Sequence, residues 1–293
     1  MIHFAQLPLV RKSKKGTLPN LIVIGARKCG TTSLHYYLGL HPQISMSRKK
    51  ELDFFIREGN WHRGIEWYRS NFAGEVRIYG ESSPNYTDYP FFDGVPERMY
   101  SVVPEAELIY ILRDPIDRII SDYVHQYAAR RENRDIADVL SNLETNHYVC
   151  RSRYFMQLEQ YLKYYPRSRI LIITQEELLQ RRRETLKEVF RFLNVDDSFH
   201  SLRFFIVKHR TRDKRRVNRT GYLLKQMHGM NALRRLSPDI HWHFERWLCF
   251  PFSQRIERPG LDERLRQALI DHLRDDVDRL REYTGRDFED WCL

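Results

Sequence analysis

The sequence lacks any run of apolar residues that approaches the roughly 18 to 20 needed for a membrane-spanning helix. It also lacks the basic start and apolar centre of a secretory signal, because apolar residues precede the charges in MIHFAQLPLVRKSKKG. We therefore expect no membrane span and a cytoplasmic location. The four cysteines are far apart, without a CxxC or CxxxH group, so neither a zinc site nor a disulfide framework is indicated.

Linkers and repeats are also absent. No Pro-, Ser- or Gly-rich linker, fixed-period repeat or low-complexity segment divides the 293 residues. We predict a basic N-terminal extension over residues 1–17 and a single domain over residues 18–293. Hydrophobic residues (42%) and charged residues (30%) are balanced as in a soluble globular protein. The net charge of +10 favours anionic partners, and no feature of the sequence sets an oligomeric state.

Short apolar runs alternate with longer helical periods, which is typical of a parallel sheet wrapped by helices. Each predicted strand ends in polar residues, and the strands lie at 21–25, 76–80, 107–112 and 169–174. The predicted helices lie at 31–40, 61–71, 114–130, 151–165, 175–194 and 261–283. The last of these has one apolar stripe, which we expect to pack on the protein's own core. The fold class is therefore α/β, with a central parallel sheet flanked by helices.

The loop after the first strand carries a phosphate-site pattern. Gly25 and Gly30 are five residues apart, as in the phosphate loop GxxxxGK[ST], but Thr31 stands where that loop has its lysine. Backbone amides and a helix N-terminus still favour an anion there. The only lysine in the loop is Lys28, three residues earlier. This departure weakens the arrangement for a magnesium nucleoside triphosphate and favours a nucleotide with another group on its 5′ phosphate.

At this point a family resemblance appears. GARKCGTTSLHYYLGLHPQI, from Gly25, looks like the 5′-phosphosulfate loop of the sulfotransferases that use 3′-phosphoadenosine 5′-phosphosulfate (PAPS). Three further motifs follow in the order of the heparan sulfate type of sulfotransferase domain and its bacterial relatives: KKELDFF at 49–55, GESSPNY at 80–86 and ILRDPIDRIISDY at 111–123. The resemblance covers nearly the whole chain from about residue 20, and it implies a P-loop-type three-layer fold.

The resemblance also implies roles for the cofactor site. Lys28 lies inside the cradle, where a cation stabilises the charge that develops as the phosphosulfate bond breaks. The family's pattern assigns the 3′ phosphate to Arg113 and Ser121, and a weak PAPS contact to Arg219 in the Arg-rich run 203–219. The 5′ site is completed by Arg27, Gly30, Thr31, Thr32 and Ser33.

On the acceptor side, Glu51 occupies the position of the general base in the heparan sulfate type. Two neighbouring positions depart from the family. Asp53 stands where many relatives have His, and Ser82 where related glycan enzymes often carry a lysine, so both are weak candidates for acceptor contacts. The predicted reaction is in-line transfer from PAPS to a hydroxyl or amine of a glycan, lipid or natural product, without a metal.

Two other functions remain open. A small-molecule kinase is favoured by the Gly25 and Gly30 spacing, and a magnesium requirement would identify it. A non-catalytic protein that binds anions or nucleic acid is suggested by the net charge of +10, although no RNP-like pattern, zinc finger or basic heptad array supports nucleic acid as a partner. Cys29 could be reactive at a helix N-terminus, but no paired base is identifiable, so we interpret it as a packing residue.

Overall fold

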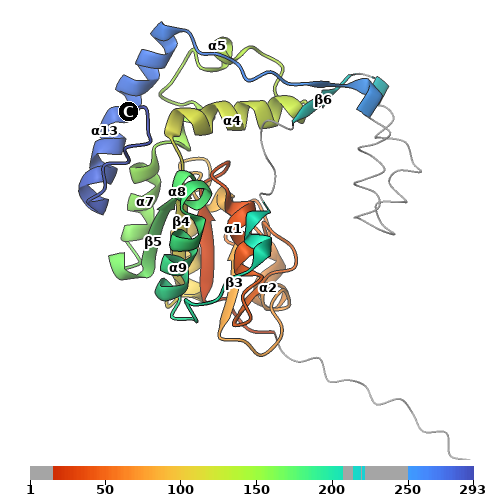
Figure 1. The fold of residues 1–293 in the computed structure, drawn as a ribbon, viewed down its shortest axis with the longest axis vertical. Coiled ribbons are helices and arrows are strands. Elements are labelled where there is room, and N and C mark those ends of the chain that lie inside the picture. The colour runs from red at the N-terminus through yellow and green to blue at the C-terminus, as the bar shows by residue number, and fades with distance from the viewer. Residues whose placement is uncertain (1–15, 207–213, 219, 222–249) are drawn as a thin grey trace, which may run out of the picture.

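The structure is a computed structural model that describes residues 16–206, 214–218, 220–221 and 250–293. Its centre is a five-stranded parallel sheet with the order β2-β3-β1-β4-β5. The strands are β1 (Leu21–Gly25), β2 (Ile44–Met46), β3 (Ile78–Ser82), β4 (Glu107–Leu112) and β5 (Ile170–Thr174). Helices flank the sheet (Figure 1). The predicted α/β class is confirmed.

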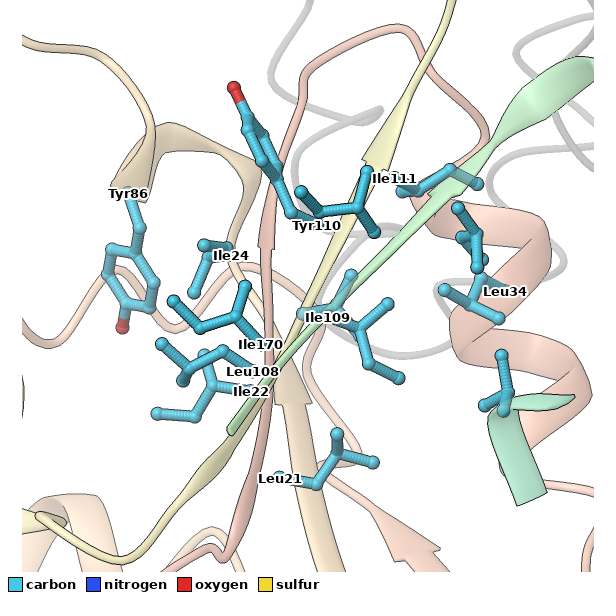
Figure 2. Close-up of a cluster of buried hydrophobic side chains, with 14 of the residues drawn as sticks. Leu21, Ile22, Ile24, Leu34, Tyr86, Leu108, Ile109, Tyr110, Ile111 and Ile170 are labelled. Carbon is cyan, nitrogen blue, oxygen red and sulfur yellow. The ribbon is translucent and has the colours of Figure 1, made fainter. Parts of the chain in front are cut away.

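Both faces of the sheet are covered. Leu34 of α1 (Thr31–Leu38) and Tyr86 lie on opposite sides of the strands (Figure 2). The Tyr161 hydroxyl of α7 (Tyr154–Leu162) donates to the Tyr86 carbonyl oxygen at 2.8 Å, so α7 covers the face opposite α1. The central strands β1 and β4 are almost entirely apolar and buried, as expected for a parallel sheet covered on both faces.

The remaining described helices follow the order of the chain. The longer ones are α4 (Pro115–Ala128), α9 (Arg182–Phe192) and α13 (Glu263–Thr284). The shorter ones are α2 (Gly64–Arg69), α3 (Val95–Val102), α5 (Ile136–Val139), α6 (His147–Cys150) and α8 (Gln175–Gln180). Single 3-10 turns are η1 (Trp61–Arg63), η2 (Pro84–Tyr86), η3 (Arg167–Arg169), η4 (Leu202–Phe205) and η6 (Phe250–Phe252). Among these helices, none has the length and apolarity to cross a membrane.

The C-terminal helix α13 joins two groups of buried side chains. Leu269 and Leu273 pack with the apolar side of α4, while Val277 and Leu280 belong to the main core around the sheet. The apolar stripe predicted for residues 261–283 therefore packs on the protein's own core, as expected. Asp276 joins α13 to α7, because its carboxylate accepts the backbone N–H groups of Phe155 and Met156 at the start of α7.

Some predicted boundaries were wrong. The strand expected at 76–80 runs over Ile78–Ser82 instead, because the polar Glu81 and Ser82 pair with β1 and are buried. The helix expected over 175–194 divides into α8 and α9, with Arg181 between them. The helix expected over 31–40 ends earlier, at Leu38, and Gly30 is its N-cap.

Three short strands escaped prediction. The edge strand β2 has only three residues, and β6 (Arg215–Val217) pairs antiparallel with β7 (Ser253–Arg255). All three are too short to give a clear alternation of apolar and polar residues. The β6 strand lies against α4 and brings Lys214 toward the loop that follows β1.

Candidate active site

The loop between β1 and α1 leaves the carboxyl end of a central strand. Gly25 is required there, because a Cβ atom on it would lie 2.0 Å from the Thr87 hydroxyl oxygen. Lys28 (φ 69°) and Gly30 (φ 95°) both adopt the left-handed backbone conformation. Gly30 is the N-cap of α1 and makes no side-chain cap, so the first amides of the helix are open to an anion. The predicted phosphate cradle therefore has the backbone that it needs.

Positive charge is concentrated at this loop. The pKa of Lys28 is lowered to about 8, chiefly by burial and also by the nearby cations Lys214, Arg27 and Arg113, while Asp122 acts in the opposite direction. Within the described residues, no carboxylate lies at ion-pair distance from Lys28. A bound anion would supply the missing negative charge. The electrostatics of the loop thus match an anionic ligand.

Arg27 is held between η2 and α4. Its Nη1 donates to Asn85 Oδ1 at 2.8 Å, and its Nη2 lies 3.8 Å from Asp122 Oδ1. Asp122 is fully buried on α4 and also pairs with Arg118 at 3.2 Å and Arg151 at 3.3 Å. These three cations hold the pKa of Asp122 well below its usual range, although burial acts in the opposite direction. Asp122 therefore stays ionised as the shared counter-charge.

The predicted 3′-phosphate residues lie beside this cluster. Arg113 follows β4 and is 16% exposed, and its Nη2 donates to Asp117 Oδ2 at 2.8 Å. Ser121 is buried on α4, between Asp117 and Asp122 in the sequence. The Tyr154 hydroxyl donates to the Arg113 carbonyl oxygen at 2.8 Å. That hydroxyl also lies 3.7 Å from Cys29 Sγ, so Tyr154 contacts both halves of the predicted nucleotide site.

Cys29 behaves as a packing residue. Burial raises the pKa of its thiol to about 12, which keeps the thiol protonated at neutral pH. Thr31 and Ser33, in the first turn of α1, are also buried, while Thr32 is partly exposed. Arg219 lies outside the described residues.

The second loop of the candidate site, Glu51–Phe55, follows β2. Leu52, Phe54 and Phe55 are buried, whereas the Glu51 side chain is 49% exposed and its Oε1 lies 2.6 Å from Lys50 Nζ. Burial opposes ionisation of Glu51, but Lys50, Arg27 and His125 outweigh it and lower the pKa of its carboxyl. Glu51 is therefore ionised at neutral pH, which is the form that a general base requires.

The two other acceptor-side candidates are already bonded within the protein. Asn85 Nδ2 donates to Asp53 Oδ1 at 3.2 Å and to Oδ2 at 3.1 Å. Asn85 also accepts from Arg27, so one amide joins the two loops. Ser82 is fully buried, with its hydroxyl 3.0 Å from His35 Nδ1. Contacts of Asp53 and Ser82 with an acceptor stay a prediction.

The sequence analysis did not identify several residues that lie close to the predicted site. His125 is electrostatically coupled to Lys28, Arg27 and Lys214, and burial followed by these cations lowers its pKa to about 4. Its Nδ1 is buried without a partner among the described residues. The i,i+4 spacing from Ser121 on α4 was the signal that could have found it. Asn85 gave no such signal, because Arg27 and Asp53 are distant in sequence, and the i,i+4 pair of Asp122 with Arg118 does not indicate its further pairing with Arg27 and Arg151. In the described ranges, no group of three His, Cys, Asp or Glu side chains is placed to hold a metal ion.

The sheet and the loop after β1 define an α/β protein of the phosphate-loop type, with that loop at the carboxyl edge of the sheet. Comparison with protein families gives the more specific assignment, since the sulfotransferase domain matches residues 18–243. The chain belongs to the sulfotransferase family.

Named relatives agree with this assignment. The chain is 32% identical to heparan sulfate glucosamine 3-O-sulfotransferase 5 of Homo sapiens over 190 residues, 61% of this chain and 54% of the relative. It is 33% identical to bifunctional heparan sulfate N-deacetylase/N-sulfotransferase 4 of Mus musculus over 208 residues, 62% of this chain and 23% of the relative. The chain thus spans about half the length, or less, of these curated relatives.

Among solved structures, the chain is similar to a sulfotransferase from Alicyclobacillus acidocaldarius. The two share 25% sequence identity and a TM-score of 0.68, and the match covers 94% of this chain and 99% of the other. The P-loop-type α/β fold expected from the family resemblance is confirmed.

Proposed function

We propose that this protein transfers the sulfuryl group of PAPS to a hydroxyl or amine of an acceptor molecule. The observation that carries this proposal is the loop between β1 and α1, where open helix amides gather with Lys28 and Arg27. Membership of the sulfotransferase family supports the same reaction. Sulfuryl transfer resembles phosphoryl transfer, in which catalysis depends on positioning and on neutralising charge. The cations gathered at this loop suit both the positioning of an anionic donor and the neutralisation of its charge.

On the donor side, the open amides at the start of α1 bind the 5′ phosphosulfate of the substrate. Lys28 donates to the bridging oxygen and neutralises the charge that this oxygen gains as its bond to sulfur breaks. Arg113 and Ser121 bind the 3′ phosphate, and Arg27 orients the sulfuryl oxygens. The backbone and hydroxyl contacts come from Gly30, Thr31, Thr32 and Ser33.

On the acceptor side, Glu51 takes the proton of the attacking hydroxyl or amine. Its exposure and its ionised state support this role. The curated relatives are named for heparan sulfate, so a glycan is the acceptor that we propose to test before a lipid or a natural product. We further propose that the reaction takes place in the cytoplasm and without a metal.

Calorimetric titration with adenosine 3′,5′-bisphosphate in EDTA tests the donor site. We expect tight binding that depends on the 3′ phosphate, with adenosine 5′-phosphate binding much more weakly. Preference for magnesium ATP would instead support a small-molecule kinase, and absence of binding would overturn the proposal. Transfer of radiolabel from PAPS to desulfated heparan sulfate then tests the acceptor class, with a neutral glycan as the comparison.

A further inference from the structure

A buried carboxylate lies directly behind the loop that carries Glu51. Glu81, on β3, is fully buried, and three hydroxyl groups donate to it. Tyr68 Oη donates to Oε1 at 2.6 Å, Tyr86 Oη donates to Oε1 at 2.9 Å, and Ser83 Oγ donates to Oε2 at 2.7 Å. Burial raises the pKa of Glu81 and these hydrogen bonds oppose it, which leaves the pKa at about 7. Both oxygens of the carboxylate therefore accept at least one hydrogen bond from a hydroxyl group.

Two of these hydroxyls also accept hydrogen bonds from the Glu51–Phe55 loop. Ser83 Oγ accepts the backbone N–H of Asp53 at 3.1 Å. Tyr86 Oη accepts the N–H of Phe54 at 2.9 Å and that of Phe55 at 3.4 Å. Three consecutive loop amides are therefore bonded to side chains that Glu81 itself orients.

Above about pH 7 Glu81 is mainly ionised, and the ionised carboxylate then determines the direction of these hydrogen bonds. A hydroxyl can donate or accept, whereas an ionised carboxylate only accepts. Because the Ser83 and Tyr86 hydroxyls donate to Glu81, their lone pairs face the loop amides. The loop needs such support, since Glu51 (φ 63°) and Asp53 (φ 46°) both adopt a left-handed backbone that is unfavourable for residues other than glycine.

We propose that Glu81 is a positioning residue for sulfuryl transfer, which fixes the backbone of the Glu51–Phe55 loop through the Ser83 and Tyr86 hydroxyls and so holds Glu51 in line for proton transfer. This inference rests on the proposed function of Glu51. Glu81 itself does not touch the substrate, because Tyr68, Ser83 and Tyr86 surround its carboxylate.

The test is Glu81→Gln, which keeps the shape of the side chain but presents an amide donor to Ser83. Misplacement of a reacting group by about 1 Å can cost about 100-fold in rate, so we expect kcat to fall by about 10 to 100-fold. Binding of adenosine 3′,5′-bisphosphate should stay within about twofold, since the donor loop has separate supports. Unchanged kcat in this variant would overturn the proposal.

Two further variants keep the test decisive if Glu81→Gln folds poorly. Ser83→Ala and Tyr86→Phe each remove one acceptor of the loop amides and should lower kcat as Glu81→Gln does. Tyr68→Phe should have a smaller effect, because within the described residues its hydroxyl bonds to Glu81 and to no loop amide. An equal loss in all three variants would contradict a role through the loop backbone.

A control separates positioning from general destabilisation. Asp276 is also a buried carboxylate that accepts backbone N–H groups, but it joins α13 to α7. Asp276→Asn should lower the melting temperature and leave kcat unchanged at temperatures well below unfolding. A fall in kcat that tracks melting temperature across the Glu81 and Asp276 variants would reduce Glu81 to a structural role.

A double-mutant cycle with Glu51→Gln completes the test. If Glu81 acts through Glu51, adding Glu81→Gln to Glu51→Gln should cause little further loss in single-turnover rate with radiolabelled PAPS. Independent, multiplicative losses would overturn the positioning role and leave the role of Glu51 intact. Full activity of Glu51→Gln alone would instead overturn the proposed general base, and the positioning role with it.

Discussion

The two loops of the candidate active site differ in the contacts that hold them in place. The donor loop, Gly25–Thr32, is held by secondary structure: it joins β1 to α1, and the N–H of Ala26 donates to the Ile111 carbonyl oxygen at 2.7 Å. The acceptor loop, Glu51–Phe55, has one backbone hydrogen bond to β3, from the Glu51 N–H to the Ser82 carbonyl oxygen at 3.0 Å, and is otherwise held by side chains, since the Ser83 and Tyr86 hydroxyls accept the amides of residues 53–55. Backbone geometry shapes the first loop, and a buried polar network shapes the second.

This difference separates binding from chemistry. Open amides and cations at the donor loop can bind an anion without help from the acceptor loop. The acceptor loop carries an ionised carboxylate whose position depends on buried groups. Substitutions in one loop should therefore change nucleotide affinity, and substitutions in the other should change turnover.

Glu51→Gln should show the largest difference between its effect on turnover and its effect on nucleotide affinity. General base catalysis contributes about 100 to 10,000-fold, so kcat should fall by about 1,000-fold. Binding of adenosine 3′,5′-bisphosphate, measured by calorimetry, should be retained because the donor loop is untouched. Glu66→Gln, at an exposed carboxylate paired with Arg69, is the matched control and should keep full activity. Near-normal turnover of Glu51→Gln would remove the distinction between the loops.

Lys28→Ala should affect both binding and chemistry. Loss of one group that stabilises developing charge costs about 100 to 1,000-fold in kcat. Affinity for the bisphosphate should weaken as well, because the loop loses a cation that has no carboxylate partner in the described part of the chain. Steady-state kinetics and calorimetry measure the two effects, with the exposed Lys163→Ala as the control. Undiminished activity would exclude Lys28 from the mechanism.

The donor loop should also make affinity depend on pH. Burial lowers the pKa of Lys28 to about 8, so above that pH the free protein holds a neutral amine. An anion favours the protonated form, and binding must then take up a proton. Affinity for the bisphosphate should therefore be level from pH 7 to 8 and fall by up to about tenfold per pH unit above 8. The decline should be absent in Lys28→Ala, and its persistence there would assign it to another group.

The smallest effect is expected where the two loops meet. Asn85→Ala removes the amide that joins Arg27 to Asp53. A hydrogen bond to a charged group is worth about 1.5 to 3 kcal/mol, most of which water can replace here, so we expect a loss of about threefold to tenfold in kcat/KM. Asn20→Ala is the control. Asn20 lies just before β1, and its side-chain amide bonds to residues 77 and 79 at the start of β3. Equal losses in both variants would deny Asn85 a role in coupling the loops.

The sequence predicted the place of the loop between β1 and α1. The Gly25 and Gly30 spacing after an apolar strand indicated the loop, and the structure has both glycines where a close approach or a positive φ requires them. The position of Glu51 followed from family resemblance alone. The extent of β3 was wrong because Glu81 and Ser82 are polar, and the sequence does not indicate that Tyr68 and His35, from other elements, compensate their burial.

By itself, the sequence determined the parallel α/β sheet and the phosphate-type loop, because these depend on local periodicity and on glycines at fixed spacing. Only the tertiary structure decided which charges surround Lys28 and what supports Glu51. Asp122 comes from α4, Asn85 from η2 and Glu81 from β3, all more than 25 residues from the loop that each one serves. Contacts between such distant segments arise from packing, which local sequence patterns do not encode.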